Sequence, residues 1–256
     1  MHIMTADNIE IYFEVVGQGI PLVMLHGFMN TLAENDKWAP LLPGYQLILP
    51  DARGHGRSGK PRDPSAYTLA KRTSDVIALL DHLGIQKAHC MGYSMGGWVS
   101  LGLAATYPER FYAMIAGGIG PDALNPESSR MWREPMVTAM KGGMENYCRE
   151  VEAAEKRTMS AEERAFYLAQ DHKALVAMLS LEEEIDFRHT LANSSADLLM
   201  YVGELDMHHD SAKELCARLP HAHFLSIPGR DHGSAAEPPD FLVTEILRFL
   251  TATMQE

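Results

Sequence analysis

Cysteine is scarce in this chain, which contains three cysteines among 256 residues. Cys90, Cys148 and Cys216 lie far apart and form no Cys-x-x-Cys pair. An odd number of widely spaced cysteines argues against a disulfide framework and against a structural zinc site. The pattern instead predicts free thiols in a reducing compartment.

Long apolar runs are missing as well. No stretch approaches roughly 18 uninterrupted apolar residues, the minimum for a candidate membrane-spanning helix. The segment that follows Met1 also lacks the basic stretch before an apolar run that is typical of a secretion signal. We therefore expect no membrane anchor and a cytoplasmic protein.

Positive charge is in short supply, because 22 Lys and Arg residues stand against 34 Asp and Glu residues, a formal net charge of −12. Nucleic acids and anionic membranes bind basic surfaces, so we expect neither as a partner. The apolar share of 46% is that of an ordinary globular protein. These values favour a neutral or hydrophobic small-molecule ligand. We expect the chain to act as a monomer or homodimer.

Short apolar runs recur along the chain and predict strands. Residues 9–15 alternate between apolar and polar side chains and can pair with the segment around Ile3 as an opening hairpin. The other runs are continuously apolar, as in strands buried on both faces. They are residues 21–25, 46–49, 88–91, 113–116, 198–202 and 223–227.

Helical periodicity fills most of the intervals between these strands, at residues 69–83, 97–107, 212–219 and 241–250. Alternating strands and helices predict a parallel sheet covered by helices on both faces. Residues 121–191 break this rhythm, since they contain no strand-like run. Ser160 begins a capping box and Asp171 can cap a second helix, so this segment is expected to be a helical insertion rich in methionine.

The sharpest chemical signal is Gly-Tyr-Ser-Met-Gly-Gly at residues 92–97, directly after one predicted strand and directly before a predicted helix. A nucleophilic serine on such a turn needs small neighbours, because the turn is tight and strained. Ser94 is therefore the candidate nucleophile. The alternative is a glycine-rich packing turn with an incidental serine.

A serine hydroxyl needs a base and an orienting carboxylate to attack a carbonyl group. His232 follows the last predicted strand and is the histidine expected at the same sheet edge as Ser94, whereas His208 is interpreted as a surface residue. Asp206 follows the preceding strand and is the leading acid. Asp122 is its main rival in chain order, and Glu204 and Asp231 lie close by in the sequence.

Two backbone amides are expected to form the oxyanion hole, one from Met95 after the nucleophile and one from Phe28 in the loop after an earlier strand. The glycine-dense segment 51–59 lacks a Gly-Lys-Ser/Thr ending and is followed by prolines, so it is interpreted as a structural loop. No metal site is expected at His208 and His209, because adjacent side chains diverge. No cofactor is expected.

These motifs together resemble the α/β-hydrolase superfamily, in the form that has a single core domain and a helical cap. The shared positions are residues 26–28, 51–58, 92–97, 107–110 and 203–206, and His232 with residues 237–238. The resemblance implies an eight-stranded, mostly parallel sheet flanked by helices. It also implies a triad of Ser94, His232 and Asp206, with the Phe28 and Met95 amides as oxyanion hole. Asp231 departs from the small residue often found before this histidine, and we expect it to point to solvent.

The predicted organisation is therefore a core domain of residues 1–120 and 192–256, with a helical cap at residues 121–191. The predicted activity is hydrolysis of carboxylic esters carrying small to medium hydrophobic groups. Phe28, Tyr93 and the cap residues Met136 and Met140 are expected to contact the substrate. Alternatives are a lactonase, a carbon–carbon bond hydrolase, a perhydrolase or haloperoxidase-like enzyme with the same triad, and a ligand receptor that turns over slowly.

Overall fold

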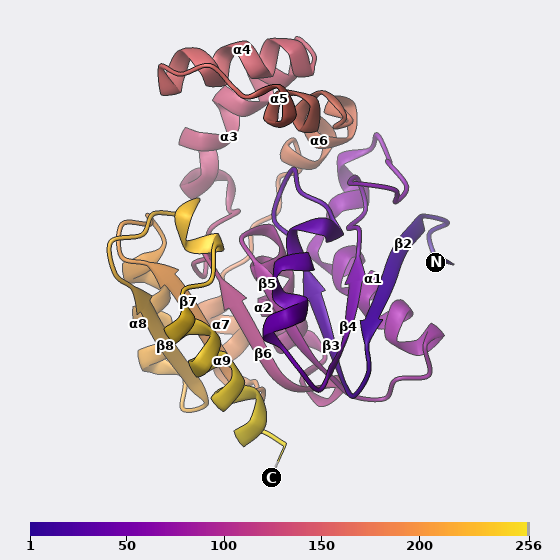
Figure 1. The fold of residues 1–256 in the computed structure, drawn as a ribbon, viewed down its shortest axis with the longest axis vertical. Coiled ribbons are helices and arrows are strands. Elements are labelled where there is room, and N and C mark those ends of the chain that lie inside the picture. The colour runs from indigo at the N-terminus through magenta and orange to yellow at the C-terminus, as the bar shows by residue number, and fades with distance from the viewer. Residues whose placement is uncertain (255–256) are drawn as a thin grey trace.

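The computed structural model describes residues 1–254, which form an eight-stranded sheet with helices on both faces (Figure 1). The order of the strands across the sheet is β1-β2-β4-β3-β5-β6-β7-β8. The strands are β1 His2–Met4, β2 Glu10–Gly17, β3 Ile20–Leu25, β4 Tyr45–Pro50, β5 Ala88–Tyr93, β6 Phe111–Gly117, β7 Leu198–Gly203 and β8 Ala222–Ile227. Every strand predicted from the sequence is present.

The pairing of the strands follows their composition. The opening hairpin pairs β1 with β2 in antiparallel fashion, with Ile3 opposite Ile11, and β2 is also antiparallel to β4. From β4 to β8 the neighbouring strands are parallel. The continuously apolar runs form these parallel strands, since helices cover both faces of the sheet. The predicted fold class, an α/β-hydrolase fold with a mostly parallel sheet, is confirmed.

Helices cover both faces of the sheet and also form a separate layer above it. They are α1 Leu69–His82, α2 Met95–Thr106, α3 Pro126–Lys141, α4 Met144–Glu155, α5 Ala161–Leu168, α6 His172–Leu179, α7 Phe187–Thr190, α8 His209–Arg218 and α9 Asp240–Ala252. Apolar side chains of α1, α2, α7 and α8 pack in one core cluster. Those of α9 and of a 3-10 helix at Leu32–Leu41, which the sequence did not predict, pack in the cluster on the other face.

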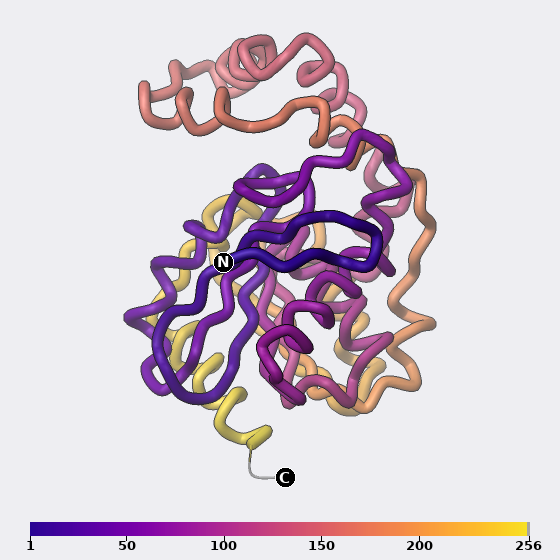
Figure 2. Tube along the Cα trace, turned by 90° about the vertical axis from the view of Figure 1, so that its right-hand side faces the viewer, coloured from indigo at the N-terminus to yellow at the C-terminus, as the bar shows by residue number. Residues whose placement is uncertain are grey.

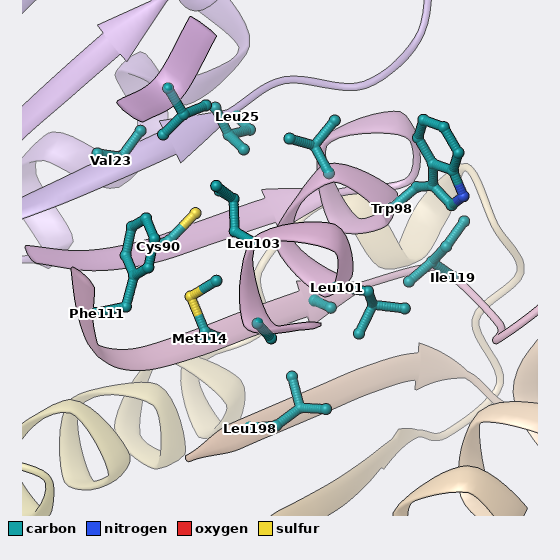
Figure 3. Packing of buried hydrophobic residues seen from close by; sticks show 14 of the residues in the cluster. Val23, Leu25, Cys90, Trp98, Leu101, Leu103, Phe111, Met114, Ile119 and Leu198 are labelled. Carbon is teal, nitrogen blue, oxygen red and sulfur yellow. The ribbon is translucent and has the colours of Figure 1, made fainter. Parts of the chain in front are cut away.

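Helix α2 occupies the centre of the larger core cluster. Figure 3 shows Leu101 and Leu103 of this helix beside Cys90 of β5 and Met114 of β6, all fully buried. Nearly all of α2 is buried, which explains why its sequence is apolar around the whole circumference. This packing fixes the N-terminus of α2 at the end of β5, where the candidate nucleophile lies.

Helices α3 to α6 form a separate layer above the sheet, here called the helical layer (Figures 1 and 2). Two of its caps were predicted: the Ser160 hydroxyl accepts the Glu163 amide at 3.0 Å, and Asp171 accepts the Lys173 amide at 3.1 Å. Helix α7 returns to the sheet, since Phe187 is fully buried in the core cluster of that face. The division of the chain at residues 121 and 191 stays a prediction.

The free thiols predicted from the sequence are present, since Cys90, Cys148 and Cys216 are buried and form no disulfide. Burial raises the pKa of Cys90 to about 12, and that of Cys216 to about 12 as well. Thiols with such pKa values are poor nucleophiles. Within residues 1–254, no helix combines the length and the apolar character needed to cross a membrane.

Candidate active site

Ser94 lies on a sharp turn between β5 and α2 with a φ of 53° and a ψ of −111°. A non-glycine residue rarely adopts this left-handed backbone, and it persists only where the surroundings enforce it. Helix and strands approach so closely here that a Cβ on Gly92 would lie 2.2 Å from the Gly96 carbonyl oxygen, and one on Gly96 would lie 2.1 Å from that of Leu25. The glycines of the motif thus permit the turn that projects the serine from the sheet edge.

The imidazole of His232 lies between the serine and an aspartate. Its Nε2 is 3.0 Å from Ser94 Oγ, and its Nδ1 is 2.7 Å from Asp206 Oδ2. Asp206 follows β7 and His232 follows β8, which are neighbouring parallel strands, so both loops emerge at the same edge. With Nδ1–H donating to the carboxylate, Nε2 is free to accept the serine proton.

The carboxylate of Asp206 is held ready for this interaction. Its side chain is fully buried, and Oδ1 accepts the His208 amide at 3.0 Å. Burial opposes the charge, but the hydrogen bond and charge of His232, together with the His208 amide, outweigh it. The pKa of the Asp206 carboxyl is therefore below its ordinary value. A buried, ionised carboxylate on Nδ1 orients the imidazole and stabilises its protonated form.

The rival carboxylates have other partners. Asp122 lies 3.3 Å from Arg188, and Glu204 accepts the Gly229 amide at 2.8 Å. Asp231 is exposed, as expected, and accepts the Ser234 amide at 2.8 Å. Among the carboxylates considered from the sequence, Asp206 is the one that the structure pairs with His232.

The two candidate oxyanion donors flank the serine. Phe28 and Met95 line the same cavity as Ser94. Neither main-chain amide donates a hydrogen bond to another described residue, so both N–H groups are free for a ligand oxygen. Met95 is also the first residue of α2, where the helix dipole favours negative charge.

The glycine-dense turn after β4 supports the loop that carries Phe28, in agreement with the structural role predicted for residues 51–59. His55 Nε2 accepts the Met29 amide at 3.2 Å, and Asp51 Oδ1 accepts the Leu32 amide at 2.8 Å. In return, the Ala52 amide donates to His26 Nε2 at 3.0 Å. Burial lowers the pKa of both histidines, which keeps these rings neutral and able to accept.

A cavity of about 840 Å³ opens above the serine, between the sheet edge and the helical layer. This volume is in the range of sites for small molecules. Large aromatic and thioether side chains dominate the wall. They include Phe28, Tyr93, Trp98, Trp132, Met136 and Met178.

Met140 departs from its expected place at the cavity. It is fully buried beside Met144, Tyr147 and Leu175, inside the helical layer, and does not line the cavity. Helix α3 rises away from the sheet (Figure 1). Met136 lines the cavity, whereas Met140, one turn later, packs among residues of α4 and α6. Composition alone could not separate these two methionines.

Several residues at the site were not predicted. Trp98 could have been predicted from the sequence, because it lies four residues after the candidate nucleophile Ser94 and therefore on the same face of α2. Arg72 of α1 gave no such signal. His208 is half-buried with its ring centroid 6.1 Å from that of His232, so its interpretation as a surface residue is wrong. Within residues 1–254, no three metal-ligating side chains cluster together.

Comparison with known proteins agrees with this fold. A family model described as alpha/beta hydrolase fold matches residues 20–195. The pimeloyl-[acyl-carrier protein] methyl ester esterase of Xanthomonas campestris pv. campestris (strain B100) is 29% identical over 260 residues, which cover 94% of this chain and 99% of that protein. The enol-lactonase of Burkholderia xenovorans LB400 shares the fold, with a TM-score of 0.83 at 21% identity over 98% of this chain and 100% of that one.

Other relatives match in part only. The putative 2-succinyl-6-hydroxy-2,4-cyclohexadiene-1-carboxylate synthase of Bacillus subtilis (strain 168) is 30% identical over 130 residues. That match covers 49% of this chain and 47% of the relative, so it spans about half the length of either protein.

Proposed function

This chain belongs to the alpha/beta hydrolase fold family, and we propose that it is a serine hydrolase that cleaves carboxylic esters through an acyl-enzyme on Ser94. One observation carries the proposal: His232 bridges Ser94 Oγ at 3.0 Å and Asp206 Oδ2 at 2.7 Å, at the floor of a largely apolar cavity. The methyl ester esterase named above, which aligns over nearly its whole length, supports the same chemistry.

In the first half of the proposed reaction, Ser94 Oγ attacks the ester carbonyl carbon while its proton passes to His232 Nε2. The carbonyl oxygen becomes an oxyanion, which the free amides of Phe28 and Met95 stabilise by hydrogen bonds. The tetrahedral intermediate then collapses. The alkoxy group leaves with the proton from Nε2 as an alcohol, and the acyl group remains on Ser94.

In the second half, water loses a proton to the same nitrogen and attacks the acyl carbonyl carbon. Collapse of the second intermediate releases the carboxylic acid and returns the proton to Ser94. The ion pair with Asp206 stabilises the imidazolium in both halves. The apolar wall formed by Trp98, Trp132 and Met136 suits small to medium hydrophobic groups.

Trapping with a fluorophosphonate probe tests the nucleophile directly. We expect one adduct, located on the peptide that contains Ser94 by mass spectrometry and missing from Ser94→Ala. A panel of linear esters and lactones then defines the substrate range, with Ser94→Ala as the background control. A folded wild-type protein that takes no adduct and hydrolyses none of these compounds would contradict the proposal.

A further inference from the structure

Arg72 is a buried cation with too few partners. Its exposed fraction is 6%, its Nε donates to the Tyr67 carbonyl at 2.8 Å, and its Nη1 is buried without any hydrogen-bond partner among the described residues. No described carboxylate lies within ion-pair distance of this guanidinium. Burial lowers the pKa of Arg72 to about 10, so the side chain is still positively charged at neutral pH.

The other two buried arginines are fully engaged. Arg53 pairs with Asp75 at 2.5 Å and with Asp7 at 2.9 Å. Arg133 donates from Nε to the Leu179 carbonyl at 3.0 Å, and its terminal nitrogens reach further carbonyls and a serine hydroxyl. A buried charge without a counter-charge is costly. Arg133 also lacks a counter-charge, but Arg72 is the one of the three that has a buried terminal nitrogen without a hydrogen-bond partner among the described residues.

The position of Arg72 shows where that partner comes from. Arg72 lines the cavity that contains Ser94 and Met95, and its guanidinium carbon is 5.8 Å from the ring centroid of Trp98, another residue of the wall. On its other side it borders a small internal cavity of about 40 Å³. Arg72 is therefore one of the residues that a ligand in the large cavity would lie against.

We propose that Arg72 binds a carboxylate group of the substrate, so that the preferred substrates are esters that also carry a free carboxylate. The inference rests on the proposed ester hydrolysis for its reaction, and it replaces the neutral ligand that the net charge suggested. A guanidinium and a carboxylate form two parallel hydrogen bonds. The acidic Glu34 and Glu183 also line the cavity, and they repel a doubly charged phosphate more strongly than a singly charged carboxylate.

Matched esters test this assignment. The half-methyl esters of the linear dicarboxylic acids from succinic to suberic acid are each compared with the neutral methyl ester of the same chain length, by methanol release. We expect wild type to favour the best half-ester by about tenfold or more in kcat/KM, since hydrogen bonds to charged groups are strong. In Arg72→Met, kcat/KM for that half-ester should fall about ten- to one-hundredfold, and kcat/KM for the neutral ester should change by less than about threefold.

Two further variants control for charge and folding. Lys71→Met removes a positive charge from the neighbouring position of α1 and should leave both rates unchanged, because Lys71 does not line the cavity. Arg72→Lys keeps the charge without the bidentate geometry and should retain an intermediate preference. The inference would be overturned if Arg72→Met lowered kcat/KM equally for the half-ester and the neutral ester, or if wild type hydrolysed both equally well. Either result would assign the guanidinium a packing role.

Binding without turnover separates this inference from the proposed reaction. Isothermal titration of Ser94→Ala with the same half-esters should show binding that is lost in the Ser94→Ala, Arg72→Met double variant. If wild type hydrolyses no ester while this Arg72-dependent binding is observed, ester hydrolysis is wrong and the carboxylate site stands. If Ser94→Ala binds half-esters no better than neutral esters, the carboxylate site is wrong.

Discussion

The hydroxyl group of Tyr93 donates a hydrogen bond to the main-chain carbonyl of His232, so the residue before the candidate nucleophile holds the loop that carries the candidate base. The two rings also lie close, with centroids 5.6 Å apart. Gly118 makes room for this arrangement, because a Cβ there would lie 2.6 Å from the tyrosine ring. Tyr93 was expected to contact substrate, and it lines the cavity, but it also couples the two halves of the site.

Replacement of Tyr93 by Phe tests this coupling. The ring would still fill its place, while the loop would lose one hydrogen bond worth about 1 kcal/mol. We expect kcat for a good ester to fall about three- to tenfold with little change in KM, because the base is less well positioned. Tyr12→Phe, which removes a hydroxyl that contacts Glu14 at the surface, should leave kcat unchanged. An unaltered kcat in Tyr93→Phe would exclude the positioning role.

Asp206→Asn should abolish most of the activity. An asparagine amide cannot stabilise the imidazolium and favours the wrong tautomer of His232, so kcat should fall by about 10³ to 10⁴. Asp122→Asn is the matched control, since Asp122 pairs with Arg188 and has no contact with the imidazole. Steady-state hydrolysis of one ester by both variants settles the comparison. A large loss in Asp122→Asn and a small one in Asp206→Asn would reverse the assignment of the acid.

An ion pair ties the helical layer to the core and should depend on pH. Arg62 Nη2 donates to Asp171 Oδ2 at 2.7 Å, and this hydrogen bond is the main cause that lowers the pKa of Asp171 to about 2. Because the pKa of Asp171 is lower in the folded state than its value of about 4 in the unfolded chain, the ion pair stabilises the fold at pH values above about 4. This contribution is lost as the pH falls towards 2.

Arg62→Met should therefore loosen α6 at neutral pH, by at most about 1 kcal/mol because the pair is partly exposed. Amide exchange of α6 should be faster in the variant at pH 7, and the difference from wild type should shrink below about pH 4. Arg248→Met, which breaks the pair with Glu245 on the distant α9, should not alter exchange in α6. A difference that persists unchanged at pH 3 would rule out the ion pair as its cause.

Gly96→Ala should disrupt the fold at the nucleophile turn. Its Cβ would lie 2.1 Å from the Leu25 carbonyl oxygen, a backbone atom of a central strand that cannot move aside. We expect a loss of at least about 3 kcal/mol in the free energy of unfolding, measured by urea denaturation. Gly84→Ala differs, because it introduces a Cβ at a positive φ but into open space, and it should cost only about 1 kcal/mol. Similar values for both variants would show that the close contact is relieved cheaply.

The sequence by itself determined the elements of the fold and the turn that carries the candidate nucleophile. Continuous apolar runs between helical periods require a covered parallel sheet, and glycines at 92, 96 and 97 between a strand and a helix mark the turn around Ser94. These are local signals, because steric crowding and burial act on neighbouring positions in the chain.

The tertiary structure decided which residues lie beside Ser94. Asp206 and Asp122 both follow strands. Because β7 and β8 are neighbours in the sheet, Asp206 lies beside His232. Asp122 instead forms an ion pair with Arg188. The tilt of α3 separates Met136 from Met140 in the same way. A charged residue on a helix such as Arg72 is usually solvated, so its sequence position gives no warning. Its burial against the cavity depends on how α1 packs, which only the folded chain specifies.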